Sequence, residues 1–427
     1  KSFRYAELPL DPLTVLIGTN ASGKSNVVEA LEFLQRIANG ENIETALVGD
    51  KKLPSIRGGV EWAARKGENG FILKVLVGVE TENKQTDFLY SLCMQTLPIL
   101  KIEDESINLK YLQDNNEYIV SDGLKLLDYN FPNLNYSSFK QTTNNFYNKE
   151  SIEEYRKKIL DLKIILDKQL SIGSFDLDKD KMLDLLSMMK NDLKIPVHTT
   201  LKNIFVINPI PSTMRDYSRL SENLESDGSN IAGVLAALPD DKKAEVENTL
   251  SEYIKYLPEG DIKKVWAEPV GRLKTDAMLY CQEEWKPGEI TEIDARSMSD
   301  GTLRFLAILT ALLTRPEGSQ IVIEEIDNGL HPSRAALLVK ILKEIGTKRN
   351  IDILLTTHNP ALLDAFGPEI VPFVVVAHRD SETGESKLTL LEDIENLPLL
   401  LASGTLGRLA TKGAIEKSLS NQKSSRL

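Results

Sequence analysis

The sequence predicts an α/β protein whose parallel sheet is interrupted by a long insertion. A short apolar run over 13–17 stops at a glycine and precedes a helical pattern over 24–38. From about residue 290 to residue 376, helix-like and strand-like segments alternate, which is typical of a parallel sheet covered by helices. Between these two parts, residues 70–120 have a strand pattern and residues 151–195 a helical one. The main domain is therefore expected to be split in sequence.

The composition indicates a globular protein with a core of its own. The chain has 427 residues, of which 41% are hydrophobic, and a net charge of −12. This charge argues against a protein covered by nucleic acid, and basic stretches at 51–66 and 417–426 are interpreted as solvated surface. Cys93 and Cys281 have no metal-binding or redox spacing, so two free thiols in a reducing cytosol are expected.

No apolar run has the length of a membrane span, and no signal peptide is visible. We therefore expect a cytoplasmic protein that has no membrane contact. The chain begins at Lys1 without a methionine and enters a strand-like pattern at once, so we expect a short leading segment before it.

The elements can be predicted in chain order. The helix over 24–38 should end near Gly40. Strands over 71–77 and 88–94, with a polar turn over 80–86, predict a small antiparallel sheet, and 129–149 a loop. Further predicted elements are a strand over 204–207, a helical region over 230–254, strands over 265–270 and 277–281, and the final strand over 373–376.

The region 151–195 has two helical patterns separated by a Gly-Ser break at 173–174. It is either a helical hairpin that projects from the main domain or a pair of helices that packs on the core. Four segments follow from these patterns: 1–125 (first part of the main domain), 126–198 (loop and helical insertion), 199–289 (connecting α/β segment) and 290–427 (second part of the main domain).

Residues 18–25 match the phosphate-loop pattern G-x-x-x-x-G-K-[ST], with a predicted strand before them and a helix after them. Glycines at 18 and 23 allow a tight loop, so backbone N–H groups from Asn20 to Ser25 can surround a phosphate. Lys24 would add a positive charge, and the Ser25 hydroxyl would bind Mg²⁺. The helix start adds its positive dipole end. ATP with Mg²⁺ is therefore the predicted ligand.

Glu324 and Glu325 end an apolar, β-branched strand pattern. Such a strand can place one carboxylate beside Mg²⁺ and the next beside the attacking water. We assign Glu324 to the metal and Glu325 to the general base. An acidic pair at a strand end is otherwise common on protein surfaces.

Two further segments fit the same chemistry. Ser299 and Gly301 stand at the start of an apolar helical pattern, where a helix end can bind an anion. Because the phosphate loop already fills its own site, that anion would be the phosphate of a second chain; the alternative is an ordinary capped helix. His358 follows a buried strand pattern and could contact a γ-phosphate, although a lone histidine there is often structural.

Together these segments resemble the ABC-type ATPase heads of the RecF, SMC and OLD-nuclease group. The phosphate loop and Asn26 match the form "GxNxSGKSN" of that group, and residues 298–302 resemble its signature motif. Residues 321–325 resemble its Walker B strand, 328–332 its D-loop, and His358 its switch histidine. The resemblance covers both ends of the chain. It implies an α/β ABC-type P-loop head with an antiparallel β subdomain and an inserted helical subdomain.

The resemblance also implies a homodimer or higher homo-oligomer, in which Ser299 and Gly301 of one copy face the Lys24 loop of the other. Glu324 replaces the usual aspartate, and Asp300 and Thr302 replace glycine and glutamine of the transporter signature. These departures resemble the OLD and defence-ATPase branch. The sequence after His358 is too short for a Toprim nuclease domain, so a stand-alone ATPase is expected.

Three functions are compatible with this resemblance. The first is the ATPase subunit of a prokaryotic anti-phage defence complex, which controls a separate nuclease or toxin effector. The second is a RecF-like DNA-repair ATPase, which leaves nucleic acid open as a partner. The third is a scaffold that binds ATP with little turnover.

Overall fold

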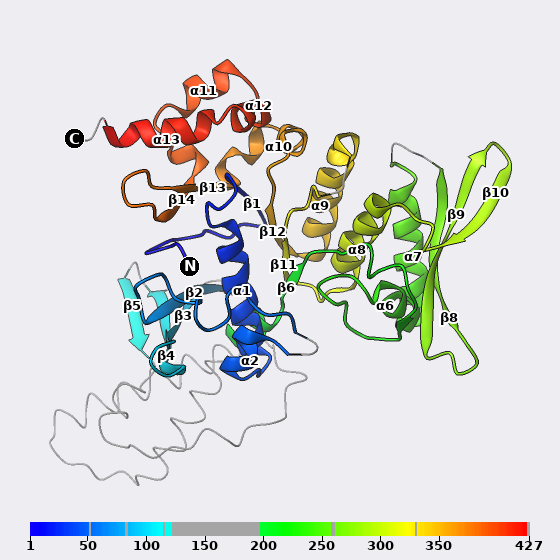
Figure 1. The fold of residues 1–427 in the computed structure, drawn as a ribbon, viewed down its shortest axis with the longest axis horizontal. Coiled ribbons are helices and arrows are strands. Elements are labelled where there is room, and N and C mark those ends of the chain that lie inside the picture. The colour runs from blue at the N-terminus through cyan, green and yellow to red at the C-terminus, as the bar shows by residue number, and fades with distance from the viewer. Residues whose placement is uncertain are drawn as a thin grey trace, which may run out of the picture. The chain divides into compact units, whose positions relative to one another are not determined.

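The computed structural model describes residues 1–50, 53–81, 84–113, 116–121, 197–257, 261–328 and 331–424. It has two compact units, one of residues 1–67 with 202–427 and one of residues 68–201 (Figure 1). The first unit is discontinuous in sequence. The boundary at 67/68 lies inside the predicted segment 1–125, and the four-segment division stays a prediction. The predicted loop over 129–149 and the helices over 151–195 lie outside the described residues.

The first unit contains a six-stranded sheet in which five neighbouring strands are parallel and the edge strand β14 is antiparallel. The predicted strands over 13–17 and 204–207 are confirmed at the same residues. In spatial order, the strands are β14 (Ser386–Leu390), β13 (Val374–Arg379), β1 (Leu13–Ile17), β12 (Asp352–Thr356), β11 (Gln320–Ile323) and β6 (Ile204–Ile207).

Helices cover this sheet on both sides, as expected for buried parallel strands. Helix α1 (Lys24–Ala38), confirmed at its predicted residues, contacts β6, and α2 (Ile43–Val48) contacts α1. Helix α8 (Asp300–Thr314) contacts β11, and helix α9 (Ala335–Arg349) contacts β12. Both helices lie on the side of the sheet opposite α1 (Figure 1).

A second sheet in the same unit contains β7 (Ser218–Arg219), β8 (Ile262–Val270), β9 (Asp276–Lys286) and β10 (Glu289–Asp294). Helices α6 (Ile231–Ala237) and α7 (Asp240–Ile254) pack on β8. The predicted helical region over 230–254 is thus confirmed by α6 and α7, and the predicted strands over 265–270 and 277–281 are confirmed by β8 and β9. Strand β10 was not predicted, because this edge strand is mostly exposed and has no apolar run.

The second unit contains an antiparallel sheet of β2 (Gly70–Thr81), β3 (Lys84–Gln95), β4 (Lys101–Gln113) and β5 (Asn116–Ser121), paired in chain order. The predicted antiparallel sheet is confirmed. The predicted turn over 80–86 is wrong, since Thr81 pairs with Lys84 and the strands continue through most of that stretch. Antiparallel strands need only a two-residue connection, so polar residues can continue the ladder.

The chain after β12 forms a helical region, of which only the part up to residue 376 falls within the predicted alternation of helices and strands. It contains α10 (Pro360–Phe366), α11 (Leu397–Ser403), α12 (Leu406–Thr411) and α13 (Ala414–Ser424), with the short 3₁₀ helices η2 (Pro368–Phe373) and η3 (Leu391–Asp393); η1 (Pro332–Arg334) precedes α9. Helix α12 lies so close to α10 that a Cβ on Gly407 would be 2.1 Å from the Pro360 carbonyl oxygen. Among the described helices, none is long and apolar enough to cross a membrane.

Candidate nucleotide site

The loop between β1 and α1 has the conformation that its glycines permit. Gly18 has φ +142°, and a Cβ there would lie 2.1 Å from the Ala377 carbonyl oxygen on β13. Gly23 has φ +114° and leads into α1. Only glycine adopts these angles without strain, so both glycines are required for this loop. The Arg379 Nε donates a 2.9 Å hydrogen bond to the Ala21 carbonyl and fixes the outer turn.

Lys24 is folded against its own loop. Its Nζ donates to the carbonyl oxygens of Gly18 at 2.6 Å and Thr19 at 3.1 Å. Burial lowers the pKa of Lys24, while the negative charges of Glu325 and Asp327 oppose this shift. The present partners of the Lys24 amine are neutral carbonyls, and a phosphate would replace them with a stronger, charge-assisted bond.

The loop also contains an unsatisfied polar atom that fits a phosphate. The Ser22 Oγ is buried and has no hydrogen-bond partner. A buried hydroxyl without a partner costs free energy, so a phosphate oxygen that accepts its hydrogen bond would be bound more tightly. With the left-handed glycines and the Lys24 cation, this atom makes the loop suitable for nucleotide phosphates.

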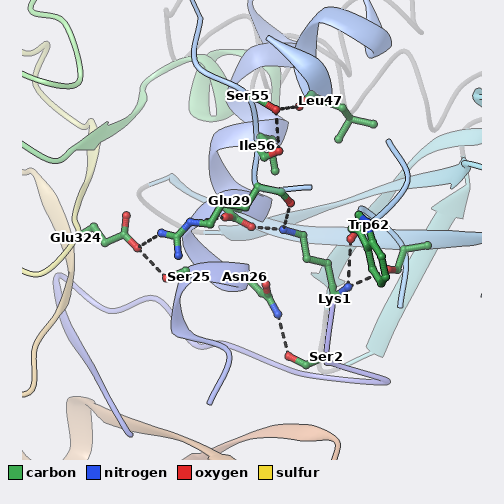
Figure 2. Close-up of polar contacts among 12 residues, drawn as sticks. Lys1, Ser2, Ser25, Asn26, Glu29, Leu47, Ser55, Ile56, Trp62 and Glu324 are labelled. Carbon is green, nitrogen blue, oxygen red and sulfur yellow. Dashed lines mark hydrogen bonds and ion pairs between the residues drawn. The ribbon is translucent and has the colours of Figure 1, made fainter. Parts of the chain in front are cut away.

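The predicted metal ligands lie together. Ser25 Oγ donates a 2.8 Å hydrogen bond to Glu324 Oε1, although β11 and α1 are far apart in sequence (Figure 2). Arg57 also contacts this carboxylate, with Nη2 3.2 Å from Glu324 Oε1 and Nε 3.2 Å from Glu29 Oε1. A hydroxyl and a carboxylate are oxygen ligands of the kind that Mg²⁺ prefers, with phosphate and water completing its shell.

Glu325 follows in an unusual backbone conformation. Its φ of +47° lies in the left-handed region, which is uncommon for a non-glycine residue and concentrates at functional sites. Its backbone N–H donates a 2.8 Å hydrogen bond to Thr356 Oγ1 at the end of β12. The side chain is exposed. The turn therefore directs Glu324 to Ser25 and leaves the Glu325 carboxylate free to meet a ligand.

His358 lies beside an acid that sequence reasoning did not identify. Its Nε2 is 3.9 Å from Asp327 Oδ2, and Asp327 is largely buried while His358 is 62% exposed. Thr357 Oγ1 donates a 2.6 Å hydrogen bond to the other carboxylate oxygen of Asp327. The pairing arises because β12 lies between β1 and β11, so His358 emerges between the phosphate loop and the acidic turn. The signal in sequence was only an aspartate two residues after Glu325.

The described hydrogen bonds of the Ser299 side chain are local to the start of α8. Ser299 caps α8, where its Oγ accepts a 3.1 Å hydrogen bond from the Thr302 N–H and donates to Thr302 Oγ1. Gly301 is buried in the same turn. Arg215, another residue not predicted, binds three carbonyls of the preceding segment at 2.7–3.1 Å and contacts Asp300.

The remaining predicted ligands differ in their surroundings. Asn20 is exposed on the loop. The Asn26 side-chain amide donates a 2.8 Å hydrogen bond to Ser2 Oγ, so it braces the N-terminal segment in this structure (Figure 2). Arg57, interpreted from the sequence as solvated surface, is 68% exposed yet contacts Glu324. Within the described ranges, no group of three or more His, Cys, Asp or Glu residues could hold a metal by itself.

The parallel sheet and the phosphate loop at its edge define an α/β fold of the P-loop ATPase class. The chain belongs to the family described as "AAA domain, putative AbiEii toxin, Type IV TA system", whose model matches residues 13–85 and 110–364, more than half of the chain. None of the curated proteins matches this chain.

Solved structures with similarity to this chain include several SMC heads. An SMC head bound to the C-winged helix domain of ScpA has a TM-score of 0.41 and 13% identity, with 91% of this chain and 94% of that chain covered. The SMC head from Thermotoga maritima has a TM-score of 0.36 and 13% identity, with 91% and 95% covered. The Pyrococcus furiosus head with the C-terminal domain of ScpA has a TM-score of 0.36 and 12% identity, with 93% and 95% covered.

Proposed function

We propose that this chain binds ATP with Mg²⁺ and hydrolyses it. The contact between Ser25 and Glu324 carries the proposal, because it brings a phosphate-loop hydroxyl and a strand-end carboxylate within 2.8 Å. A Mg²⁺ ion bound between the two motifs would need one oxygen ligand from each of them. The exposed Glu325 beside them provides a base for water.

Each group has a distinct task in this proposal. Bound ATP would supply the γ-phosphoryl group that is transferred to water. Lys24 would leave the Gly18 and Thr19 carbonyls and neutralise phosphate charge. Glu325 would accept a proton from the attacking water. Asp327, itself anchored by Thr357, would orient His358 toward the γ-phosphate side of the site.

The site would be completed by a second copy of the chain. Ser299 caps the start of α8, which carries a partial positive charge, and no described hydrogen bond joins Ser299 to its own phosphate loop. Ser299 and Gly301 would therefore act on the nucleotide of the partner in a head-to-head homodimer. Nucleotide binding would then control dimer formation.

We further propose that this ATPase is a cytoplasmic subunit of a prokaryotic anti-phage defence complex, which gates a separate nuclease or toxin. The family description, which names a putative toxin of a toxin–antitoxin system, supports a toxin-linked setting. A RecF-like repair ATPase and an ATP-holding scaffold remain the alternatives. Salt-sensitive, ATP-dependent DNA binding would favour the repair function, and ATP that persists through purification without turnover would favour the scaffold.

The phosphate-loop assignment is tested with Lys24→Ala. Loss of a charge-assisted contact worth about 2 kcal/mol should weaken ATP binding about 30-fold or more. The measurement is calorimetric titration with ATP and Mg²⁺, with phosphate release assayed in parallel. Wild-type affinity in the Lys24→Ala protein would reject the site.

The effector assignment needs a separate experiment. The tagged chain is co-expressed with its flanking genes, and the bound proteins and nucleotide are identified after purification. A nuclease or toxin in stoichiometric amount supports the defence function. Retention of DNA with ATP and no protein partner contradicts it and favours the repair function.

A further inference from the structure

The Arg57 guanidinium joins two carboxylates that come from separate elements. Its Nη2 lies 3.2 Å from Glu324 Oε1, after β11, and its Nε lies 3.2 Å from Glu29 Oε1, on α1. The Arg57 side chain is 68% exposed, whereas the side chains of Glu29 and Glu324 are only 9% and 15% exposed. Carboxylates that water reaches poorly need a positive charge or hydrogen bonds nearby. Arg57 therefore supplies positive charge to Glu324 from the solvent side.

The contact uses the carboxylate oxygen that the metal would need. Glu324 Oε1 accepts a hydrogen bond from Ser25 Oγ at 2.8 Å and another from Arg57 Nη2 at 3.2 Å. A carboxylate oxygen has about two positions for a donor or a metal ion. Both positions on this oxygen are thus taken. A metal ion, or a water bound to it, reaches Glu324 Oε1 only when one of the two donors leaves.

Arg57 is the donor that can leave, because its backbone is anchored independently of its side chain. The neighbouring Ile56 is buried, and its N–H donates a 3.0 Å hydrogen bond to the Leu47 carbonyl of α2. On the other side, Gly59 N–H donates to the Ile56 carbonyl at 2.8 Å. The exposed arginine side chain can therefore turn into solvent by rotation about its own bonds. Ser25, by contrast, belongs to the phosphate loop and is itself a proposed metal ligand.

We infer that Arg57 takes the place of Mg²⁺ at Glu324 when no nucleotide is bound, and so keeps the nucleotide-free chain from holding a divalent ion. The inference rests on the proposed binding of ATP with Mg²⁺. To bind the ion alone, the chain would have to give up the ion pair with only Ser25 and Glu324 as its ligands. When ATP is present, phosphate oxygens add ligands that offset this loss. Arg57 acts through Glu324 and has no part in the chemical step.

The test is Arg57→Ala, with Mn²⁺ as a spectroscopic probe for Mg²⁺. The electron paramagnetic resonance signal of free Mn²⁺ is measured during titration of the full chain without nucleotide. Loss of a partly exposed ion pair should raise the Mn²⁺ affinity about threefold to tenfold. Arg57→Lys keeps a cation within reach of Glu324 and should stay near the wild type. Lys66→Ala is the matched control, since it removes an exposed cation of the same basic stretch, and its affinity should equal that of the wild type.

A double variant shows whether the gain comes from Glu324. Arg57→Ala combined with Glu324→Gln should lose the gain, because the amide is a weaker metal ligand than the carboxylate. Arg57→Gln should raise the affinity like Arg57→Ala, which provides a second variant if the alanine protein folds poorly. Mn²⁺ affinity that is unchanged or lower in both single variants overturns the inference. So does a gain that persists in the double variant, or an equal gain in Lys66→Ala.

The inference and the proposed function fail in different measurements. If the wild type binds no ATP, or if Lys24→Ala binds ATP like the wild type, the ATP site itself is rejected. If ATP binding depends on Lys24 and the nucleotide-free Mn²⁺ titration shows no effect of Arg57, only the role of Arg57 is rejected.

Discussion

Ser25 and Glu324 are joined by a 2.8 Å hydrogen bond across 299 positions of sequence. The hydroxyl lies in the first turn of α1, the helix after β1, and the carboxylate belongs to the residue that directly follows strand β11. Strand β12 separates these two strands in the sheet, so the contact spans its carboxyl edge. Parallel strands place their carboxyl ends at one edge, where α/β proteins bind ligands.

Glu324→Gln should raise the Mg²⁺ concentration needed for ATP hydrolysis by about tenfold or more, because a neutral amide is a weaker metal ligand than a carboxylate. The amide can still accept from Ser25 Oγ, so the loop should keep its structure. The measurement is phosphate release against Mg²⁺ concentration, with metal-free ATP binding as the control. An unchanged Mg²⁺ midpoint would show that Glu324 does not hold the metal.

Glu325→Gln should keep ATP binding and reduce hydrolysis by about 100-fold or more, since an amide cannot accept the proton of the attacking water. ATP should then accumulate on the protein and hold the dimer together. Size-exclusion chromatography with light scattering, with and without ATP, measures this dimer. Glu317→Gln, an exposed glutamate in the loop before β11, is the control. A normal hydrolysis rate in the Glu325→Gln protein would exclude the general-base role.

Stability should fall in alkali because of Cys281. This thiol is fully buried in the core, and burial raises its pKa from 9.0 to about 12. The Cys281 thiol ionises above about pH 9 in the unfolded chain but stays neutral up to about pH 12 in the folded chain. The free energy of unfolding is therefore unaffected by this thiol below about pH 9, and it falls between about pH 9 and pH 12. The loss should be about 1.4 kcal/mol per pH unit.

Denaturant unfolding from pH 8 to 11 measures this dependence, and Cys281→Ala serves as the reference. The alanine variant is expected to be less stable at pH 8, because a small cavity replaces the thiol. Its stability should decline less steeply above pH 9. If both proteins decline in parallel, other groups cause the alkaline loss and the prediction for Cys281 is wrong.

The sequence was sufficient for the elements that local pattern defines. Strand β1 and helix α1 lie at their predicted residues, because an apolar run, a glycine and a helical period mark both boundaries. The carboxylates at the end of β11 were likewise identified from strand pattern and motif. Strands β10 and β14 were not predicted, because edge strands have little apolar content and their pairing is decided by tertiary contacts.

The partners of the site residues were harder to predict. Asp327 approaches His358 only because β12 inserts beside β11, and strand order depends on long-range crossovers that no local pattern records. Arg57 reaches Glu324 from a loop with an ordinary basic composition. These contacts depend on tertiary packing, which brings charged side chains from distant parts of the sequence to the phosphate loop and the acidic turn after β11.

Ser299→Arg should abolish hydrolysis while leaving ATP binding to the single chain intact. The bulky arginine side chain would occupy the space where Ser299 is proposed to meet the nucleotide of the partner copy, and it would leave the chain's own phosphate loop unchanged. Ser299 also caps α8, so the variant loses about 1 kcal/mol of helix stability. Ser299→Ala loses the same cap without adding bulk and measures that contribution separately. The decisive experiment mixes equal amounts of Ser299→Arg and Lys24→Ala protein. If the sites are shared between copies, each mixed dimer has one intact site, which combines Lys24 of one copy with Ser299 of the other. About half of the dimers are mixed, so turnover should recover to about a quarter of that of the wild type. Absence of any recovery, with dimers present, would mean that each chain hydrolyses ATP alone.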